Sequence, residues 1–348
     1  MTAADWLRVA NRHLTQPLCA PPSLSRLLVL GPRLPGDCPV VLELHVGTGG
    51  GAVDLAIRVE EPGQARALAG LPLPAHLRDF LRRWSERRGQ LANIPCVWLE
   101  FDLDRPAEGL PTPSVCARLS RDTDLDWIVE SLLPALHGER LGAAQRRLIK
   151  RCHREIPEKG SLLYVFSLLS RPGRSIRMEI FGLEPAGALA YLDRVAPQTV
   201  APLAEIAPIF QGIDQPHLSF DIGTEILPRI GLEGSFASQR EPRWTELFTR
   251  LTARDLCSPA ERDALLAWPG YDTFWTTPAA WPLESAGVQG FCVRSLSHVK
   301  VVAQPDRPPE AKVYLLLSYV AKAGPADHST ADEEGAANSP ASRSVLST

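Results

Sequence analysis

The strongest constraint on the fold is a pattern of paired β-strands and helices that recurs along the 348 residues of the chain. In the first unit, residues 40–61, Leu42 and Leu44 share one face of a predicted strand while Glu43 and His45 share the other. Such alternation is typical of a strand, because successive side chains point to opposite faces. Each strand therefore has an apolar face that requires a partner and a charged face that does not.

Five units repeat this order, and a helix follows each of the first four strand pairs. Antiparallel pairs cannot form a doubly wound sheet, which requires parallel strands joined by crossovers. We therefore expect an α+β fold in which ten antiparallel strands close into a barrel, with helices outside and a polar lumen wide enough for a ligand. The predicted strand pairs lie within 40–61, 96–103 with 115–119, 162–169 with 175–181, 217–222 with 229–236, and 291–302 with 311–320, and the helices lie near 64–91, 124–153, 186–210 and 241–267.

The remaining segments frame this single predicted domain of residues 40–320. Residues 1–39 read as an N-terminal helix at 4–14 followed by an irregular, Pro- and Gly-rich lead-in at 15–39. Residues 321–348 lack apolar periodicity, so the sequence predicts a disordered tail.

Composition excludes several classes of protein. The net charge of −3 argues against a general nucleic-acid binder. The seven cysteines are scattered without CxxC spacing, so they predict neither a disulfide framework nor a zinc site. The sequence shows neither a basic leader followed by an apolar run nor a stretch of 18 uncharged apolar residues. We therefore expect a soluble, cytoplasmic protein that does not associate with membranes.

Short motifs in the first two units resemble those of a known family. Glu43 stands in the first strand, Ile57-Arg58-Val59-Glu60-Glu61-Pro62 ends the second, and Phe101-Asp102-Leu103 ends the third. With the five-unit layout over residues 40–320, they resemble the aromatic prenyltransferase barrel (ABBA fold), closest to its dimethylallyltryptophan synthase branch. The resemblance implies a transferase of secondary metabolism, which moves a prenyl group from an allylic diphosphate to an aromatic acceptor: an indole, a phenol or a peptide side chain.

This chemistry requires cations for the leaving diphosphate and aromatic rings that shield the carbocation from water. Strand alternation places one set of cations on the lumen face, enough to hold a diphosphate without a metal ion. No cofactor is required on this interpretation; magnesium is possible, but the sequence does not indicate it. The expected diphosphate-binding residues are Arg58, Arg118, Arg177, Arg229, Arg294, Lys300 and Lys312.

The resemblance also implies a catalytic carboxylate that acts as a base. Glu43 would orient and deprotonate the acceptor, and the alternative is a simple salt bridge to Arg58. Trp98 and Tyr314 would shield the carbocation, and Glu100 and His298 would complete the acceptor pocket. We assign no metal ligand.

Other lumen residues leave alternatives open. His45, His217 and His298 share the lumen and could instead bind zinc or act as bases. Cys116 could act as a nucleophile, although buried cysteines are usually inert.

Several lumen positions depart from the family pattern. Cys116 and Arg118 stand where the family has Lys and Tyr, Glu179 stands at another Lys position, and the K-x-Y of the fourth unit is Gly231-Leu232-Glu233. Acids and bases in the lumen are therefore nearly balanced. The alternative function is a divergent barrel that acts on or binds a cationic or peptidic ligand without prenyl diphosphate. Acceptor identity, prenyl chain length and oligomeric state stay open.

The segment of residues 268–289 is rich in aromatic side chains and long for a connection. Its rings could clasp an apolar ligand as a lid or plug the barrel end as core. We expect the plug, because large aromatic side chains are usually buried.

Overall fold

The computed structural model describes residues 2–47, 50–103, 109–171, 173–238, 241–273, 275–277, 281 and 290–321. Within these ranges, ten strands close into an antiparallel barrel, as the sequence predicts, and one short strand extends the sheet. The strands are β1 (Val40–Val46), β2 (Val53–Val59), β3 (Val97–Phe101), β4 (Ser114–Arg118), β5 (Ser161–Ser167), β6 (Ile176–Phe181), β7 (Gln215–Ile222), β8 (Ile226–Ser235), β9 (Gly270–Asp272), β10 (Gly290–Gln304) and β11 (Arg307–Ala321).

Pairing between the first and last strands closes the barrel. The ladder runs in chain order from β1 to β8, and β8 then pairs with β10. β11 pairs with β10 on one side and with β1 on the other. β9 lies outside the ring, against the N-terminal part of β10. Because every strand of the ring has two neighbours, the ring itself has no open edge.

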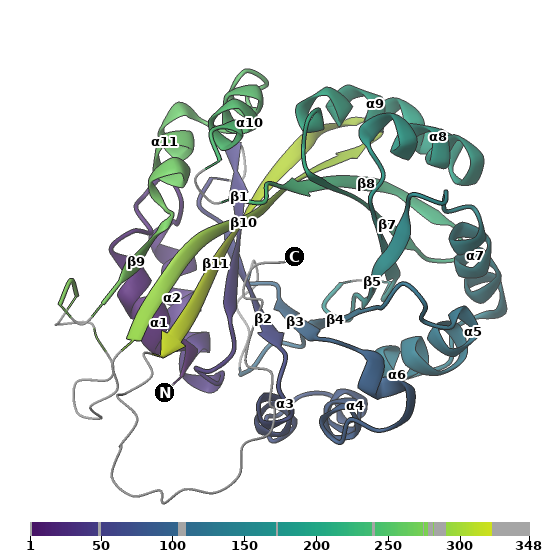
Figure 1. The fold of residues 1–348 in the computed structure, drawn as a ribbon, viewed down its shortest axis with the longest axis horizontal. Coiled ribbons are helices and arrows are strands. Elements are labelled where there is room, and N and C mark those ends of the chain that lie inside the picture. Colours follow the sequence, from purple (N-terminus) through teal and green to yellow (C-terminus); the bar gives the residue numbers. More distant parts are fainter. Residues whose placement is uncertain are drawn as a thin grey trace, which may run out of the picture.

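Helices surround the barrel wall (Figure 1). Helices α3 to α9 cover the side formed by β2 to β8, and the remaining helices lie beside the long β10–β11 hairpin (Figure 1). The α-helices are α1 (Ala3–Asn11), α2 (Pro21–Leu30), α3 (Pro62–Ala69), α4 (Ala75–Ser85), α5 (Leu125–Trp127), α6 (Leu133–His137), α7 (Ala143–Arg154), α8 (Pro185–Val195), α9 (Val200–Ile206), α10 (Arg243–Thr252) and α11 (Pro259–Ala267), with a short π-helix at Ile128–Leu132 between α5 and α6.

The main apolar core lies between the barrel wall and these helices. Leu42, Leu44 and Ile57 of the strands are fully buried there, together with Phe80 and Trp84 of α4. Complete burial of a side chain of this size contributes roughly 1.5–3 kcal/mol to folding. The predicted placement of apolar side chains between the strands and the helices is confirmed.

Two sequence predictions about helices are wrong in detail. Each helix predicted between hairpins is divided, for example at Pro74, which precedes α4, and at Gly138, whose φ of 85° ends α6. The lead-in predicted as irregular at 15–39 contains α2, which begins at Pro21. Proline is favoured in the first turn of a helix, because the N–H that it lacks has no partner there.

The aromatic segment after α11 divides into buried and exposed rings. Trp268 and Trp281 are buried, whereas Tyr271 and Trp275 are 63% and 84% exposed. The expectation that this segment plugs the barrel is therefore wrong for Tyr271 and Trp275. Residues 274, 278–280 and 282–289 of the segment lie outside the described residues.

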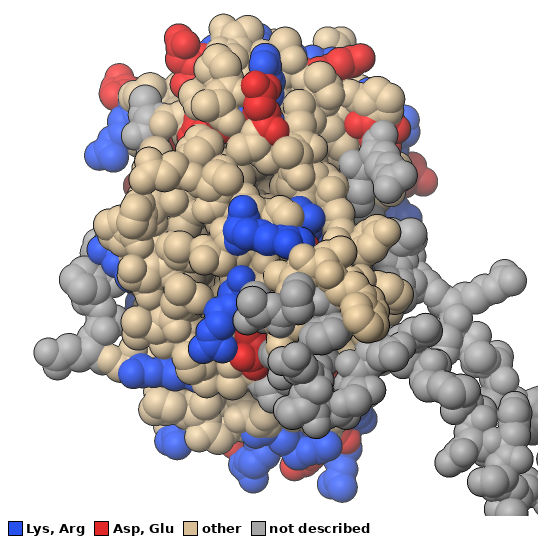
Figure 2. All heavy atoms as spheres, turned by 90° about the vertical axis from the view of Figure 1, so that its left-hand side faces the viewer, with Lys and Arg blue, Asp and Glu red and all other residues tan. Residues whose placement is uncertain are grey.

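The outer surface carries charges of both signs. The face shown in Figure 2 has Lys and Arg side chains together with Asp and Glu side chains, gathered mainly toward its two ends. No helix among the described residues has both the length and the apolar character needed to cross a membrane. The predicted tail lies outside the described residues except for residue 321, where β11 ends.

Candidate active site in the barrel lumen

A polar pocket opens into the lumen near the rim at which β1, β3 and β5 end. It has about 290 Å³ of space free of protein atoms, part of it open to solvent. Among its lining residues, Asp221 is the one carboxylate and Tyr314 the one aromatic residue. Five cations line it: Arg171, Arg177, Arg229, Lys300 and Lys312.

Each of these cations lies close to a carboxylate. Arg177 donates two hydrogen bonds of 2.7 and 3.1 Å to Asp221. Both side chains are buried, so the pair is costly to desolvate and strongly coupled. The other pairs are Lys300 with Glu233, Lys312 with Glu43, Arg229 with Glu310 at 2.7 Å and Arg171 with Asp102 at 3.7 Å.

The buried pairs shift the pKa values of their members. Burial alone would raise the pKa of Glu233, but the charge of Lys300, joined at low pH by that of protonated His298, lowers it to about 2. Burial lowers the pKa of Lys300, and the carboxylate of Glu233 opposes this effect. At neutral pH Glu233 is therefore an ionised partner of Lys300.

Gly231 on β8 leaves the room that Lys300 occupies. A Cβ atom at position 231 would lie 2.7 Å from Cε of Lys300 and 2.5 Å from Oγ of Ser219. The family pattern places a Lys at this position, and here the Lys300 side chain from the neighbouring strand β10 fills the space. The positive charge that β8 lacks at position 231 is therefore supplied by Lys300 of β10.

Two predicted diphosphate ligands belong to the other end of the lumen. Arg58 and Arg118 lie at the ends of β2 and β4, near the rim where β1 and β3 begin. Arg58 donates a hydrogen bond of 3.2 Å to Glu60, and its guanidinium lies 5.6 Å from the ring centre of Trp98. These two arginines do not line the cation pocket, and the predicted Glu43–Arg58 salt bridge is replaced by Glu43–Lys312.

The prediction that Arg294 faces the lumen is wrong. A β-bulge in β10 between Leu296 and His298 shifts the register against β11, so residues before the bulge reverse their faces. Arg294 therefore lies on the outer side, where it donates a hydrogen bond of 2.9 Å to Asp272 of β9. Its guanidinium also lies 5.5 Å from the ring centre of Trp268.

An apolar cluster separate from the main core lies inside the barrel. Cys116, Phe166 and Leu168 are its buried members, and Trp98 and Tyr164 pack against them. Burial raises the pKa of the Cys116 thiol well above its usual range, so the thiol stays protonated and is a poor nucleophile.

This lumen cluster adjoins the cation pocket. The Arg177 guanidinium lies 5.8 Å from the ring centre of Phe166. A ligand with a charged end and an apolar end could therefore contact both regions.

Tyr314 and His298 stack within the lumen. Their ring centres are 3.9 Å apart and the rings are nearly parallel, at 16°. Burial lowers the pKa of His298 to about 4, and the carboxylate of Glu233 only partly opposes this. His298 is therefore neutral at physiological pH, and the pair presents an uncharged aromatic surface beside the cations.

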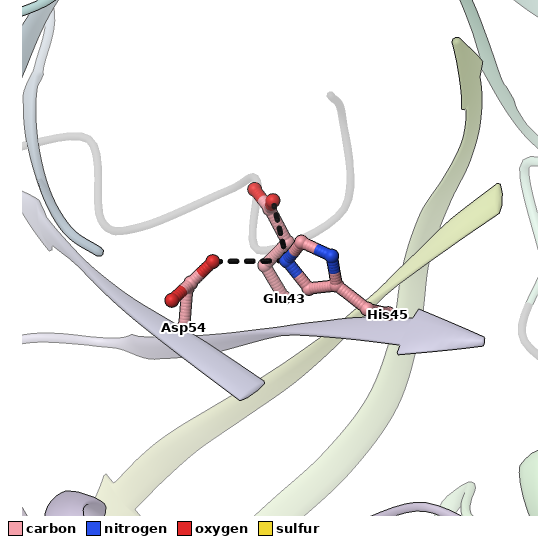
Figure 3. A group of neighbouring side chains, drawn as sticks. All are labelled: Glu43, His45 and Asp54. Atoms are coloured by element: carbon pink, nitrogen blue, oxygen red, sulfur yellow. Dashed lines mark hydrogen bonds and ion pairs between the residues drawn. The ribbon is translucent and has the colours of Figure 1, made fainter. Parts of the chain in front are cut away.

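Glu43, His45 and Asp54 form a group on β1 and β2 (Figure 3). The His45 Nε2 atom lies 3.0 Å from Asp54 Oδ2 and 3.6 Å from Glu43 Oε1. One imidazole and two carboxylates, with ligand atoms within 4.8 Å of one another, could hold a divalent transition-metal ion. Lys312 already places a positive charge against Glu43.

The pKa of Glu43 is held well below its usual range. Burial opposes this shift, but the charges of Lys312 and His45 outweigh it. The three predicted lumen histidines do not form one site, since His217 binds Glu179 and His298 stacks on Tyr314.

The pKa of Glu100 on β3 is shifted in the opposite direction from that of Glu43. Burial and the neighbouring charge of Glu43 raise its pKa to about 7, against the attraction of Arg177 and Arg171. This carboxyl group titrates near neutral pH.

Sequence reasoning missed Arg171, Tyr164 and Phe166. Arg171 lies beyond the end of β5, where strand alternation makes no prediction. Tyr164 and Phe166 alternate within β5, so the same alternation that predicted Arg177 could have found both.

No protein-family model matches the chain, and no curated protein matches its sequence. Solved structures do match. The binary complex of PriB with product diphosphate superposes with a TM-score of 0.51 and 14% identity, covering 90% of this chain and 96% of that one.

Two further matches are weaker. The ternary complex of the prenyltransferase PriB with L-tryptophan and dimethylallyl thiolodiphosphate gives a TM-score of 0.49 at 14% identity, with 90% and 94% coverage. The 5-dimethylallyltryptophan synthase of Streptomyces coelicolor gives 0.46 at 12% identity, with 90% and 95% coverage. At these identities the likeness concerns the fold.

Proposed function

We propose that this protein, whose fold is the prenyltransferase barrel (ABBA fold), transfers a prenyl group from an allylic diphosphate to an aromatic acceptor in its lumen. One observation carries the proposal: a pocket lined by five cations and a single carboxylate adjoins an apolar, aromatic cluster inside the barrel. An allylic diphosphate has the same two parts, an anionic head and an apolar tail. PriB, which shares the fold, has been crystallised with product diphosphate.

In the proposed reaction, the cation pocket stabilises the charge that develops on the leaving diphosphate. Lys312 and Arg177 contact the diphosphate, and Tyr314 shields the carbocation together with the Phe166 ring. The acceptor lies beside Trp98, where the lumen cluster excludes water from the cation. An indole, a phenol and an aromatic peptide side chain each fit this scheme.

We further propose that the transfer needs no metal ion, because side chains supply the positive charge that a metal would otherwise provide. Product formation should therefore be equal in excess chelator and in millimolar magnesium. If Glu43, His45 and Asp54 hold an ion needed for turnover, the chelator would instead reduce the rate, and added metal would restore it.

A direct titration tests the proposal. Dimethylallyl diphosphate and geranyl diphosphate are titrated calorimetrically into the purified protein, and each is then incubated with indole, L-tryptophan or 1-naphthol and analysed by mass spectrometry. We expect binding of at least one diphosphate and a product heavier by one prenyl group. If neither diphosphate binds, the proposal is wrong.

The ion pairs favour one second candidate. Since each pocket cation lies close to a carboxylate, the lumen could bind a cationic or peptidic ligand through its acids. A titration with spermidine or an oligolysine peptide distinguishes the two. Binding of the polycation that weakens as salt is raised, without any binding of diphosphate, supports this second function.

A further inference from the structure

Glu100 is exceptional among the lumen carboxylates. Glu43 and Glu233 bind lysines, Asp221 binds an arginine, and Glu179 binds a histidine. Asp54 and Asp102 likewise bind a histidine and a serine. Within the described ranges, no side chain or backbone group donates a hydrogen bond or forms an ion pair to the side-chain carboxyl group of Glu100, whose main chain pairs with β2 and β4. Its carboxyl oxygens are free to receive a proton.

The position of Glu100 along β3 places it between the two halves of the lumen. Trp98, two residues before it, packs in the lumen cluster. Asp102, two residues after it, pairs with Arg171 of the cation pocket. Alternate residues of a strand lie about 6.6 Å apart on the same face, so Glu100 stands where the diphosphate end and the aromatic end of the lumen meet.

Charged side chains of both signs, from several other strands, lie around Glu100. Its Cα partners across the ladder, Ala56 and Ser114, are uncharged. Several charged or titratable groups act on Glu100 or are acted on by it through space: Glu43 of β1, Arg171 after β5, Arg177 of β6, Lys300 of β10, Cys116 of β4 and Tyr314 of β11.

Glu43, the acid that the family resemblance puts forward as the base, is poorly suited to that role. Lys312 occupies its carboxylate and holds its pKa well below the usual range. A carboxylate stabilised in this way accepts a proton weakly. Glu43 is better suited to positioning Lys312 in the cation pocket.

We infer that Glu100, and not Glu43, accepts the proton that the aromatic acceptor loses. This inference rests on the proposed prenyl transfer. The allylic C–O bond breaks, and diphosphate leaves with the electron pair. A ring π pair of the acceptor forms the new C–C bond to the allylic cation. The ring C–H bond then breaks, its electron pair restores aromaticity, and the Glu100 carboxylate takes the proton and later releases it to water.

The test uses the full chain with dimethylallyl diphosphate and whichever of indole, L-tryptophan or 1-naphthol it prenylates. The rate is measured from pH 5 to 9 in the unmutated protein and in Glu100→Gln, Glu100→Asp and Glu43→Gln. Glu155→Gln is the matched control, because Glu155 lies on the outer surface in a pair with Arg194. Calorimetric binding of the diphosphate shows that each variant keeps its fold.

The unmutated rate should rise with pH through about 7, as Glu100 ionises. Glu100→Gln should lower the rate at pH 8 by about 10²-fold, the lower range for loss of a general base, and abolish the rise, while diphosphate affinity stays within twofold. A ring-deuterated acceptor should then show an isotope effect, because proton removal becomes slow. Glu100→Asp should keep the rise, and Glu43→Gln should move it to lower pH, because a neighbouring negative charge is removed.

A rate for Glu100→Gln within threefold of the unmutated protein, with the same pH profile, would overturn the inference and leave prenyl transfer intact. An unmutated protein that prenylates none of the acceptors would overturn the proposed function, and the inference with it.

Discussion

Burial alone raises the pKa of Glu43, Glu100 and Glu233, and a bound lysine decides whether the pKa ends below or above its usual value. Glu233 and Glu43 keep their negative charge because lysines bind them, whereas Glu100 lies among similar neighbours without one. The difference arises from side-chain pairing across the barrel. Strand alternation predicts which residues of an unbroken strand face the lumen, but not which of them contact one another.

Lys312→Ala should weaken binding of dimethylallyl diphosphate by about 10- to 150-fold, which corresponds to roughly 1.5–3 kcal/mol for one charge-assisted contact. Arg58→Ala is the matched control and should leave the affinity unchanged, because Arg58 lies near the opposite rim. Calorimetry measures both. Equal weakening in the two variants would contradict a single diphosphate site in the cation pocket.

Glu100→Gln should also change the pH dependence of stability. The pKa of Glu100 is about 7 in the folded protein and 4.5 ordinarily, so the folded state holds this proton more tightly than the unfolded state. The resulting stability is fully present below pH 4.5 and is lost as pH rises to 7. A shift of this size corresponds to at most about 3 kcal/mol.

Urea unfolding at pH 5 and pH 8 checks this expectation. The unmutated protein should lose stability between the two values, and Glu100→Gln should lose less. An equal loss in both proteins would show that Glu100 does not titrate in this range.

At the scale of elements, the strand pairs could be predicted from sequence because each strand of the ring is at least five residues long, enough for the alternation to be recognised. The bulge in β10 could not, since a single extra residue leaves the apolar pattern almost intact while it reverses the face of Arg294. The divided helices did carry signals, Pro74 and Gly138 among them. Arg171, by contrast, lies beyond a strand end, where no periodicity applies.

Arg294→Ala should destabilise the protein and leave diphosphate affinity unchanged. Removal of Arg294 leaves the fully buried Asp272 with Arg12 and His13 as its remaining partners. Breaking a buried ion pair costs up to about 3–5 kcal/mol, which lowers the melting temperature by roughly 5 °C in a protein of this size.

Arg229→Ala is the control, because the partly exposed Arg229–Glu310 pair should contribute less than about 1 kcal/mol. Differential scanning calorimetry compares the two variants. A loss of diphosphate binding in Arg294→Ala, without a change in melting temperature, would show that Arg294 binds the diphosphate and does not mainly stabilise the fold.

At the scale of the whole molecule, the closed ring depends on contacts between distant parts of the chain. β1 pairs with β11 about 270 residues later, from Val40–Leu317 to Val46–Ala311. Closure was predictable because only a closed ring of ten strands pairs the backbone N–H and C=O groups of every strand on both sides. We expect the barrel to unfold in one cooperative transition, since opening it at any strand exposes two edges.

Leu315→Asp should abolish this cooperative folding. Leu315 is fully buried on the outer face of β11, opposite Leu42 of β1, and a buried unpaired charge there is too costly to accommodate. Val320→Asp, near the end of the same strand, is the control, because Val320 is 42% exposed. Circular dichroism melting should show a single transition in the control and none in Leu315→Asp.

The apolar cluster within the lumen shares no buried residue with the core that joins the barrel wall to the helices. Residues that would contact a ligand therefore contribute little to holding the wall and helices together. A lineage, or a laboratory library, can diversify the lumen at positions such as Trp98 and Tyr164 while the scaffold keeps its thermal tolerance. Selectivity and robustness can thus evolve along separate routes in this architecture.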